Sequence, residues 1–193
     1  NDIDLIDENN FITVSDDMSV KVFDFRKLPS ESQVSRSNVT PVRSFTSSYG
    51  NVHTVKYNQG DIIIGCARAL YSINSSTGEL KQIYEGHYSD VLSIGISGSE
   101  LYSASKDRTI RKYDIKEGTP LGVFDKVHSH EVTKLQIYDD VLYSSSLDST
   151  IQEMSLETNQ ISRTFERIAL QIYTLHRNKD LLYCGCDEHV IRA

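Results

Sequence analysis

The stretch LYSASKDRTI at residues 101–110 returns as LYSSSLDSTI at residues 142–151 and as LYCGCDEHVI at residues 182–191. The three copies align without gaps, and their isoleucine ends lie 41 and then 40 positions apart. A looser copy ends at Leu70, 40 positions before the end of the first copy, and FITVSDDMSV at residues 11–20 ends 50 positions before Leu70. The chain is therefore built on an internal repeat, with one longer interval near its start.

One period contains four short segments that have the pattern of β-strands. They are VLSIGI (91–96), ELYSAS (100–105), TIRKYDI (109–115) and LGVF (121–124). Apolar and small polar residues alternate along them, and β-branched and aromatic residues are frequent, which favours strands over helices. We therefore predict an all-β protein in which each period forms a four-stranded antiparallel sheet, the unit that makes up one blade of a β-propeller.

The third period also carries four marker positions, namely Gly86-His87, Ser103, Asp107 and Tyr113-Asp114. In these residues the chain resembles the WD40-repeat family, whose blades carry a Gly-His, a Ser or Thr in the second strand, an Asp in the next turn and a closing Trp-Asp. The resemblance extends over nearly the whole chain. The chain has no Trp, so Tyr113 stands in its place in the third period. The second period is shorter by two residues at the turn, so that no Asp matches there.

In the family the marker residues form a buried chain of hydrogen bonds, which joins the Asp to the His, the Ser or Thr, and the Trp. The resemblance implies this structural role for His87, Ser103, Asp107 and Tyr113 in the third period and for His128, Ser144 and Asp148 in the fourth. Such a network satisfies buried polar groups and fixes the turn. Because Met154 replaces the Trp in the fourth period, we predict the full four-member network in the third period alone.

The resemblance implies blades around a common axis, usually seven of them in a closed ring. We expect about five blade units, at residues 1–50, 51–88, 89–129, 130–169 and, incomplete, 170–193. Residue 1 falls within a first strand and residue 193 within a third strand, so we expect a piece of a larger ring, with a five-bladed ring as the alternative. The longer first interval predicts a polar loop at residues 26–44, inserted between the third and fourth strands of the first blade.

Partner binding is expected on one face of the propeller, the top face, because rigid scaffolds carry function on their loops. The family forms this face from the turns after the second strands and from the loops that enter each blade. The turn residues are Asp16, Arg68, Lys106, Leu147 and Asp187, and the entry loops add Tyr49, Tyr88, Asp90, His130 and Glu131. We expect Arg68 and Lys106 to lie side by side and, with Tyr88, to hold an acidic or phosphorylated peptide. The alternative interpretation is that these charges are simply solvated.

Composition excludes several other classes of function. The 193 residues carry 20 Lys and Arg against 27 Asp and Glu, a net charge of -7, which disfavours binding to nucleic acid or to an anionic membrane surface. No apolar run approaches the roughly 20 residues of a membrane-spanning helix, and no signal peptide is visible. Three cysteines are too few for a disulfide framework, so we expect a reducing compartment, the cytoplasm or the nucleus.

Motifs for metal binding or catalysis are not evident. His128-Ser129-His130 has no further ligand at a suitable spacing, and Cys184-Gly185-Cys186 lacks the C-x-x-C spacing and is interpreted as small buried filler. We therefore predict no cofactor, no metal and no enzymatic activity, but a scaffold that binds other proteins or peptides. The resemblance implies, as alternatives, the substrate-recognition module of a ubiquitin ligase or the targeting domain of a signalling kinase. A propeller enzyme and a nucleic-acid binder are the remaining hypotheses.

Overall fold

The structure is a computed structural model that describes residues 1–28, 39–166, 171–179, 181–187 and the strand at 191–192. Strands dominate it, and a short 3-10 turn lies at Phe25–Lys27. The prediction of an all-β protein built from four-stranded antiparallel sheets is confirmed. The central part of the loop predicted at 26–44 lies outside the described residues. No helix among the described residues is long and apolar enough to cross a membrane.

Two of the sheets are complete blades in which four consecutive strands pair with their neighbours. The first contains β1 (Asp2–Leu5), β2 (Asn10–Val14), β3 (Ser19–Asp24) and β4 (Arg43–Thr46). The fourth contains β12 (Val132–Tyr138), β13 (Val141–Ser146), β14 (Ile151–Ser155) and β15 (Gln160–Phe165). A fifth, three-stranded sheet follows, with β16 (Ile172–Arg177), β17 (Leu182–Cys186) and β18 (Ile191–Arg192).

The second and third blades share one long strand, β8 (Leu80–Ser97). The second blade adds β5 (Thr54–Asn58), β6 (Asp61–Gly65) and β7 (Ala67–Asn74), and the third adds β9 (Glu100–Ser105), β10 (Ile110–Asp114) and β11 (Pro120–Phe124). Between its two halves β8 passes through Gly86, where φ is +132° and a Cβ would lie 2.5 Å from Arg111 Nη1. The positive φ therefore favours the glycine of the Gly-His marker, because other residues rarely adopt this backbone conformation.

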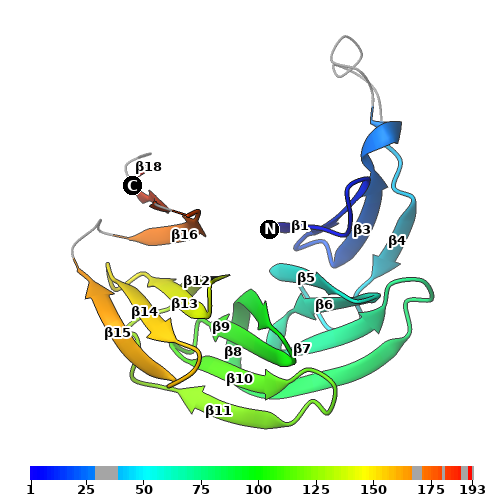
Figure 1. Cartoon of the computed structure of the whole chain (residues 1–193). Helices are drawn as coiled ribbons and strands as arrows, with labels where there is room; N and C mark the ends of the chain where they lie inside the picture. Colours follow the sequence, from blue (N-terminus) through cyan, green and yellow to red (C-terminus); the bar gives the residue numbers. More distant parts are fainter. Residues whose placement is uncertain (29–38, 167–170, 180, 188–190, 193) are drawn as a thin grey trace.

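The sheets fan out in an arc around a common centre (Figure 1). Strands β1, β5, β12 and β16 lie on the inside of the arc, and β4, β11 and β15 lie on the outside. Each junction between neighbouring blades holds one hydrophobic cluster. At the junction of the second and third blades, for example, Leu70 and Tyr84 pack with Ile94, Leu101 and Tyr113. Burial of one such side chain is worth roughly 1.5–3 kcal/mol, so the blades hold together mainly by these faces.

Polar contacts close to the centre also join neighbouring blades. Thr54 Oγ1 donates to Asp2 Oδ2 over 2.7 Å, the Leu135 N–H donates to Ser93 Oγ over 3.0 Å, and Thr133 Oγ1 donates to the Ile172 carbonyl over 2.7 Å. Each bond connects the innermost strands of two blades. They fix the order of the blades around the centre, because each donor meets an acceptor on one particular neighbour.

The first blade differs from the others in one of its faces. Ile3 on β1 pairs with Thr13, and the equivalent residue of the fourth blade is Leu135, which pairs with Ser144. The side chain of Ile3 is 59% exposed, whereas that of Leu135 is 3% exposed. The third blade buries the matching Ile94 as well. The other blades bury this face against the preceding sheet, so the first blade presents an apolar face at one end of the arc.

Candidate partner-binding face and the buried turns beside it

The turn of the third blade is held by a histidine that bridges an aspartate and a serine. His87 Nδ1 lies 2.7 Å from Asp107 Oδ2, and His87 Nε2 lies 2.7 Å from Ser103 Oγ. Asp107 also accepts the backbone N–H groups of Tyr88 and Thr109, each over 2.9 Å. A proton on Nδ1, donated to the carboxylate, leaves Nε2 to accept from the serine hydroxyl, so one neutral tautomer satisfies all three side chains.

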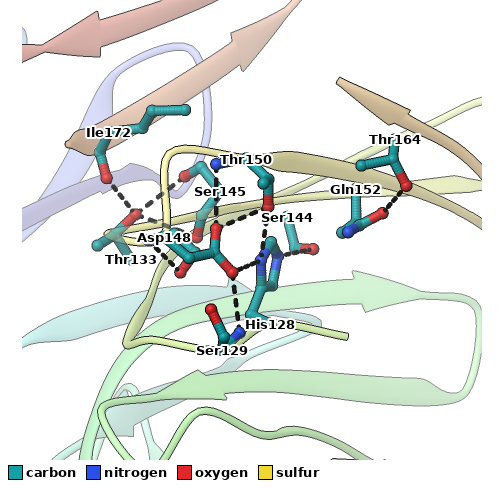
Figure 2. A network of polar contacts seen from close by, with 11 residues as sticks. His128, Ser129, Thr133, Ser144, Ser145, Asp148, Thr150, Gln152, Thr164 and Ile172 are labelled. Carbon is teal, nitrogen blue, oxygen red and sulfur yellow. Dashed lines mark hydrogen bonds and ion pairs between the residues drawn. The ribbon is translucent and has the colours of Figure 1, made fainter. Parts of the chain in front are cut away.

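The fourth blade contains the same arrangement (Figure 2). His128 Nδ1 lies 3.0 Å from Asp148 Oδ2, and His128 Nε2 lies 2.8 Å from Ser144 Oγ. The Ser129 and Thr150 N–H groups donate to the same carboxylate over 2.9 and 3.0 Å. The loop that enters the blade and the turn after β13 are thus tied together through one carboxylate.

Burial and hydrogen bonding act in opposite directions on these carboxylates. Burial raises the pKa of Asp107. The hydrogen bonds from His87, Thr109 and the Tyr88 N–H together lower it by more, so that its pKa is well below the ordinary value. The pKa of Asp148 is lowered in the same way against its burial. Burial lowers the pKa of His128, although the neighbouring Asp148 opposes this shift. In the fourth blade, ionised Asp148 beside neutral His128 is therefore the resting state of the turn.

The fourth place that we predicted for Tyr113 is not formed by a hydrogen bond of ordinary geometry. In the part of the chain that the structure describes, no such bond reaches its hydroxyl, although burial raises the pKa of Tyr113 and the nearby Arg111 and Ser103 side chains oppose this shift. The ring instead packs edge-on against Tyr84, with 5.7 Å between the centroids, in the apolar junction of the second and third blades. Met154 occupies the matching place in the fourth blade and is also buried. The two blades therefore share the same three-member network of His, Asp and Ser.

The turn of the second blade is shorter than its counterparts by one residue, not by the two we expected. The Cys66 N–H donates to the Ala69 carbonyl, whereas the Ser105 N–H donates to the Thr109 carbonyl, one residue further along. Arg68 has φ of 67°, as Arg108 has φ of 71°, and each residue directly precedes the residue that closes its turn. Arg68 thus takes the place of Arg108, and our alignment of Arg68 with Lys106 needs correction.

Lys106 and Tyr88 meet partners other than those we expected. Lys106 Nζ lies 2.9 Å from Asp90 Oδ2 in an ion pair. The guanidinium beside the exposed ring of Tyr88 belongs to Arg111, 5.6 Å from the centroid. Lys106 is thus already paired, and Arg68 occupies another turn position than we assumed. The cationic pocket that we predicted from Arg68, Lys106 and Tyr88 stays a prediction.

A pocket of about 290 Å³ opens instead where the inner ends of the blades meet. It is lined by Asn1, Asp16, His53, Leu92, Glu131, Thr133, Leu147 and Tyr173, which come from all five blade units. We call it the central mouth. Asp16, Glu131 and Leu147 were among the predicted top-face residues. The other five were missed. Four of them could have been found, because His53, Leu92, Thr133 and Tyr173 each directly follow a buried landmark of the repeat, and successive strand residues point to opposite sides. Those landmarks are Val52, Val91, Val132 and Ile172.

The central mouth is negatively charged. His53 Nδ1 lies 3.3 Å from Asp16 Oδ1, and His53 Nε2 lies 3.6 Å from Asp90 Oδ2. The hydrogen bond from Lys106 to Asp90 raises the pKa of Lys106, and the charges of Asp90, Glu131 and Asp16 raise it further. Asp16 and Glu131, which line the mouth, and the neighbouring Asp90 therefore place three carboxylates near Lys106. Asp16 is exposed and Glu131 is partly exposed, so that an incoming group can reach them.

The remaining predicted residues lie apart from the mouth pocket. Tyr49 stacks on Tyr71 with 3.8 Å between the ring centroids and belongs to the junction of the first and second blades. The Asp187 N–H donates to the Gln171 carbonyl at the start of the fifth sheet, and His130 and Arg68 are exposed. In the described part of the chain, no three His, Cys, Asp or Glu side chains are grouped so that they could hold a metal ion.

Comparison with known proteins agrees with this geometry. Residues 78–114 match the family model described as "WD40: WD domain, G-beta repeat". No curated protein matches the chain. Among solved structures, the crystal structure of the computationally designed Ika8 protein (crystal packing No.1 in P63) is similar, with a TM-score of 0.79 and 22% sequence identity over 99% of this chain. The alignment covers 56% of that designed chain, so the present chain spans little more than half its length.

The matched segment contains β8 to β10 and, with them, His87, Ser103 and Asp107. The likeness to the designed protein shows the fold alone. The resemblance inferred from the marker residues is thereby confirmed: the chain carries a WD40 repeat at residues 78–114, set within consecutive β-propeller blades.

Proposed function

We propose that this chain is a non-catalytic scaffold that binds a partner protein at the central mouth. WD40 repeats generally act as protein-interaction scaffolds. The observation that carries the proposal is the pocket itself, to which all five blade units contribute a side chain. A surface built from several blades can recognise a partner only when the blades are assembled, and this is how a rigid scaffold positions its loops.

The charges at the mouth favour a partner segment with a basic side chain. Asp16, Asp90 and Glu131 outnumber the single Lys106, whose charge is already engaged by Asp90. An acidic or phosphorylated segment would meet repulsion here, whereas an ammonium or guanidinium group would pair with Asp16 or Glu131. Leu92, Leu147 and Tyr173 add apolar surface for the stem of such a side chain.

The surroundings of His87 and His128 fit a structural role better than a catalytic one. His87 and His128 have buried side chains, and both of their ring nitrogens are engaged by the turn aspartate and the strand serine. A general base must be within reach of the proton it removes, and these two rings face the interior of the turn. We infer that their role is to hold the turns that shape the mouth.

The test is affinity capture from a cell lysate with the chain and with a double variant, Asp16→Asn with Glu131→Gln. The matched control is Asp139→Asn. Asp139 lies on the exposed turn between β12 and β13, whereas Glu131 directly precedes the other end of β12. We expect a partner that is captured by the parent and the control and is lost with the double variant. Equal capture by all three would refute binding at the mouth.

A further inference from the structure

Two cysteines lie beside each other in the fifth sheet. Cys184 and Cys186 are two residues apart on β17, and their Sγ atoms are 3.4 Å apart. Neither is in a disulfide in the structure. Cys184 is buried, and Cys186 is partly exposed. Residues two apart in a strand share one face, so the short distance between the sulfurs follows from the regular strand.

The same two positions are serines in the third and fourth blades, where both hydroxyls are used. Ser144 Oγ contacts His128, and Ser146 Oγ accepts the Asp148 N–H over 3.0 Å. In the fifth unit the residue four positions before Ile172 is Ile168, so the sequence offers no histidine for Cys184. In place of the two hydroxyls, the fifth unit therefore carries two thiols whose sulfur atoms contact each other.

The local backbone favours closer approach of the two sulfurs. Two strand rises of about 3.3 Å place the Cα atoms roughly 6.6 Å apart, within the upper part of the range of about 4.4–6.8 Å found for disulfides. The residue between them, Gly185, lies so close to β16 that a Cβ would be 2.6 Å from Thr174 Cγ2. The pairing with β16 is irregular between Ile172 and Thr174, directly opposite this segment. A glycine beside a β-bulge can adjust its backbone as the sulfurs close to bonding distance.

We propose that Cys184 and Cys186 form a reversible intrachain disulfide, which makes the fifth sheet a redox-sensitive element. The oxidant is a small disulfide such as oxidised glutathione. The Cys186 thiolate, which is the more exposed, attacks it to form a mixed disulfide and releases one glutathione. Cys184 then gives up its proton and attacks the Cys186 sulfur, which releases the second glutathione. Two protein thiols and one glutathione disulfide thus become one protein disulfide and two glutathione thiols.

Cys66 provides an internal control. It is buried between the first and second blades, and burial raises its pKa to about 11. Its contact is with Ser47 Oγ at 3.9 Å and not with a thiol. A buried thiol with a raised pKa is a poor nucleophile, so Cys66 should keep its proton and remain unmodified.

The experiment treats the folded, fully reduced 193-residue chain with excess oxidised glutathione, traps the remaining thiols with an alkylating agent, and maps the products by mass spectrometry. We expect the loss of two of the three thiols, a peptide that contains linked Cys184 and Cys186, no retained glutathione, and full recovery of both thiols with reduced glutathione. The Cys66→Ser variant should behave like the parent. Retention of all three thiols, a lasting glutathione adduct on the parent, or a dimer linked through these cysteines would overturn the proposal.

Single variants test the order of the two steps. With Cys184→Ser the reaction should stop at a stable glutathione adduct on Cys186. With Cys186→Ser, glutathione should add to the buried Cys184 at least tenfold more slowly than it adds to Cys186 in the first variant. Near-ultraviolet circular dichroism of each variant verifies that the fold is kept. Equal rates of adduct formation at Cys184 and Cys186 in folded variants would contradict the assigned roles.

Discussion

His87 and His53 both face aspartates, but their surroundings differ. His87 has no exposed side-chain surface, and its partner Asp107, 2.7 Å away, is 6% exposed. His53 lies at the central mouth, 3.3 Å from Asp16, which is 61% exposed. The same pair of residue types therefore serves two purposes. In the turn each polar atom is satisfied by another, whereas at the mouth the carboxylates remain open to solvent and to a partner. Burial, and not residue type, separates a structural pair from a binding surface.

Removal of the buried aspartate should have the largest effect on stability. Asp107→Ala leaves His87 and the N–H groups of Tyr88 and Thr109 without their shared acceptor. We expect a loss of about 1–3 kcal/mol in the free energy of unfolding, measured by urea denaturation. Asp148→Ala should cost a similar amount, because the fourth blade has the same contacts. Variants as stable as the parent would show that the network is not structural.

Acid should weaken the same turns. The folded pKa of His128 is lowered, so the unfolded chain binds the proton more readily, and stability falls as the pH drops below about 6.5. The pKa values of Asp107 and Asp148 are also lowered, so their contribution is present above about pH 4 and is lost as the pH falls further. Thermal unfolding between pH 7.5 and 3.5 should thus show a continuous fall in Tm, and the upper part of this fall should shrink in His128→Gln. A Tm that rises on acidification would contradict the assignment.

Substitutions at the mouth, in contrast to those in the buried turns, should weaken partner binding and have little effect on stability. Asp16→Asn with Glu131→Gln should change the free energy of unfolding by no more than about 0.5 kcal/mol. Binding of a basic peptide from the captured partner should weaken by roughly threefold to tenfold, the range expected for partly exposed ion pairs. Titration calorimetry at two salt concentrations measures this change. A large loss of stability with unchanged affinity would reverse the roles of the two regions.

The smallest effect is expected at Tyr113. Because no hydrogen bond of ordinary geometry reaches its hydroxyl from the described residues, Tyr113→Phe removes an unsatisfied polar group and keeps the ring in the cluster with Tyr84. We expect stability to be unchanged or higher by up to about 1 kcal/mol in urea denaturation. A clear loss of stability would mean that the hydroxyl does complete the network, as the sequence alone led us to predict.

The repeat revealed the blades because strand alternation and turn residues are local properties of the sequence. It also identified His87, Ser103 and Asp107, whose spacing depends only on the lengths of strands and turns. The direction of the Tyr113 hydroxyl depends on packing across a blade junction, which no local pattern encodes. The partners of Lys106 likewise depend on how neighbouring blades place Asp90 and His53. His53 could have been found, because it follows the landmark Val52 and must point away from the buried side.

Buried His–Asp pairs hold the turns, and we propose that the open carboxylates at the mouth meet the partner. Hydrogen exchange of the chain, with and without the captured partner, tests this proposal most directly. We predict that the partner slows exchange at residues 15–19, 52–54 and 130–134, which surround the mouth, and leaves the outer strands β11 and β15 unchanged. Protection confined to the outer strands, with exchange at the mouth unaltered, would contradict the account.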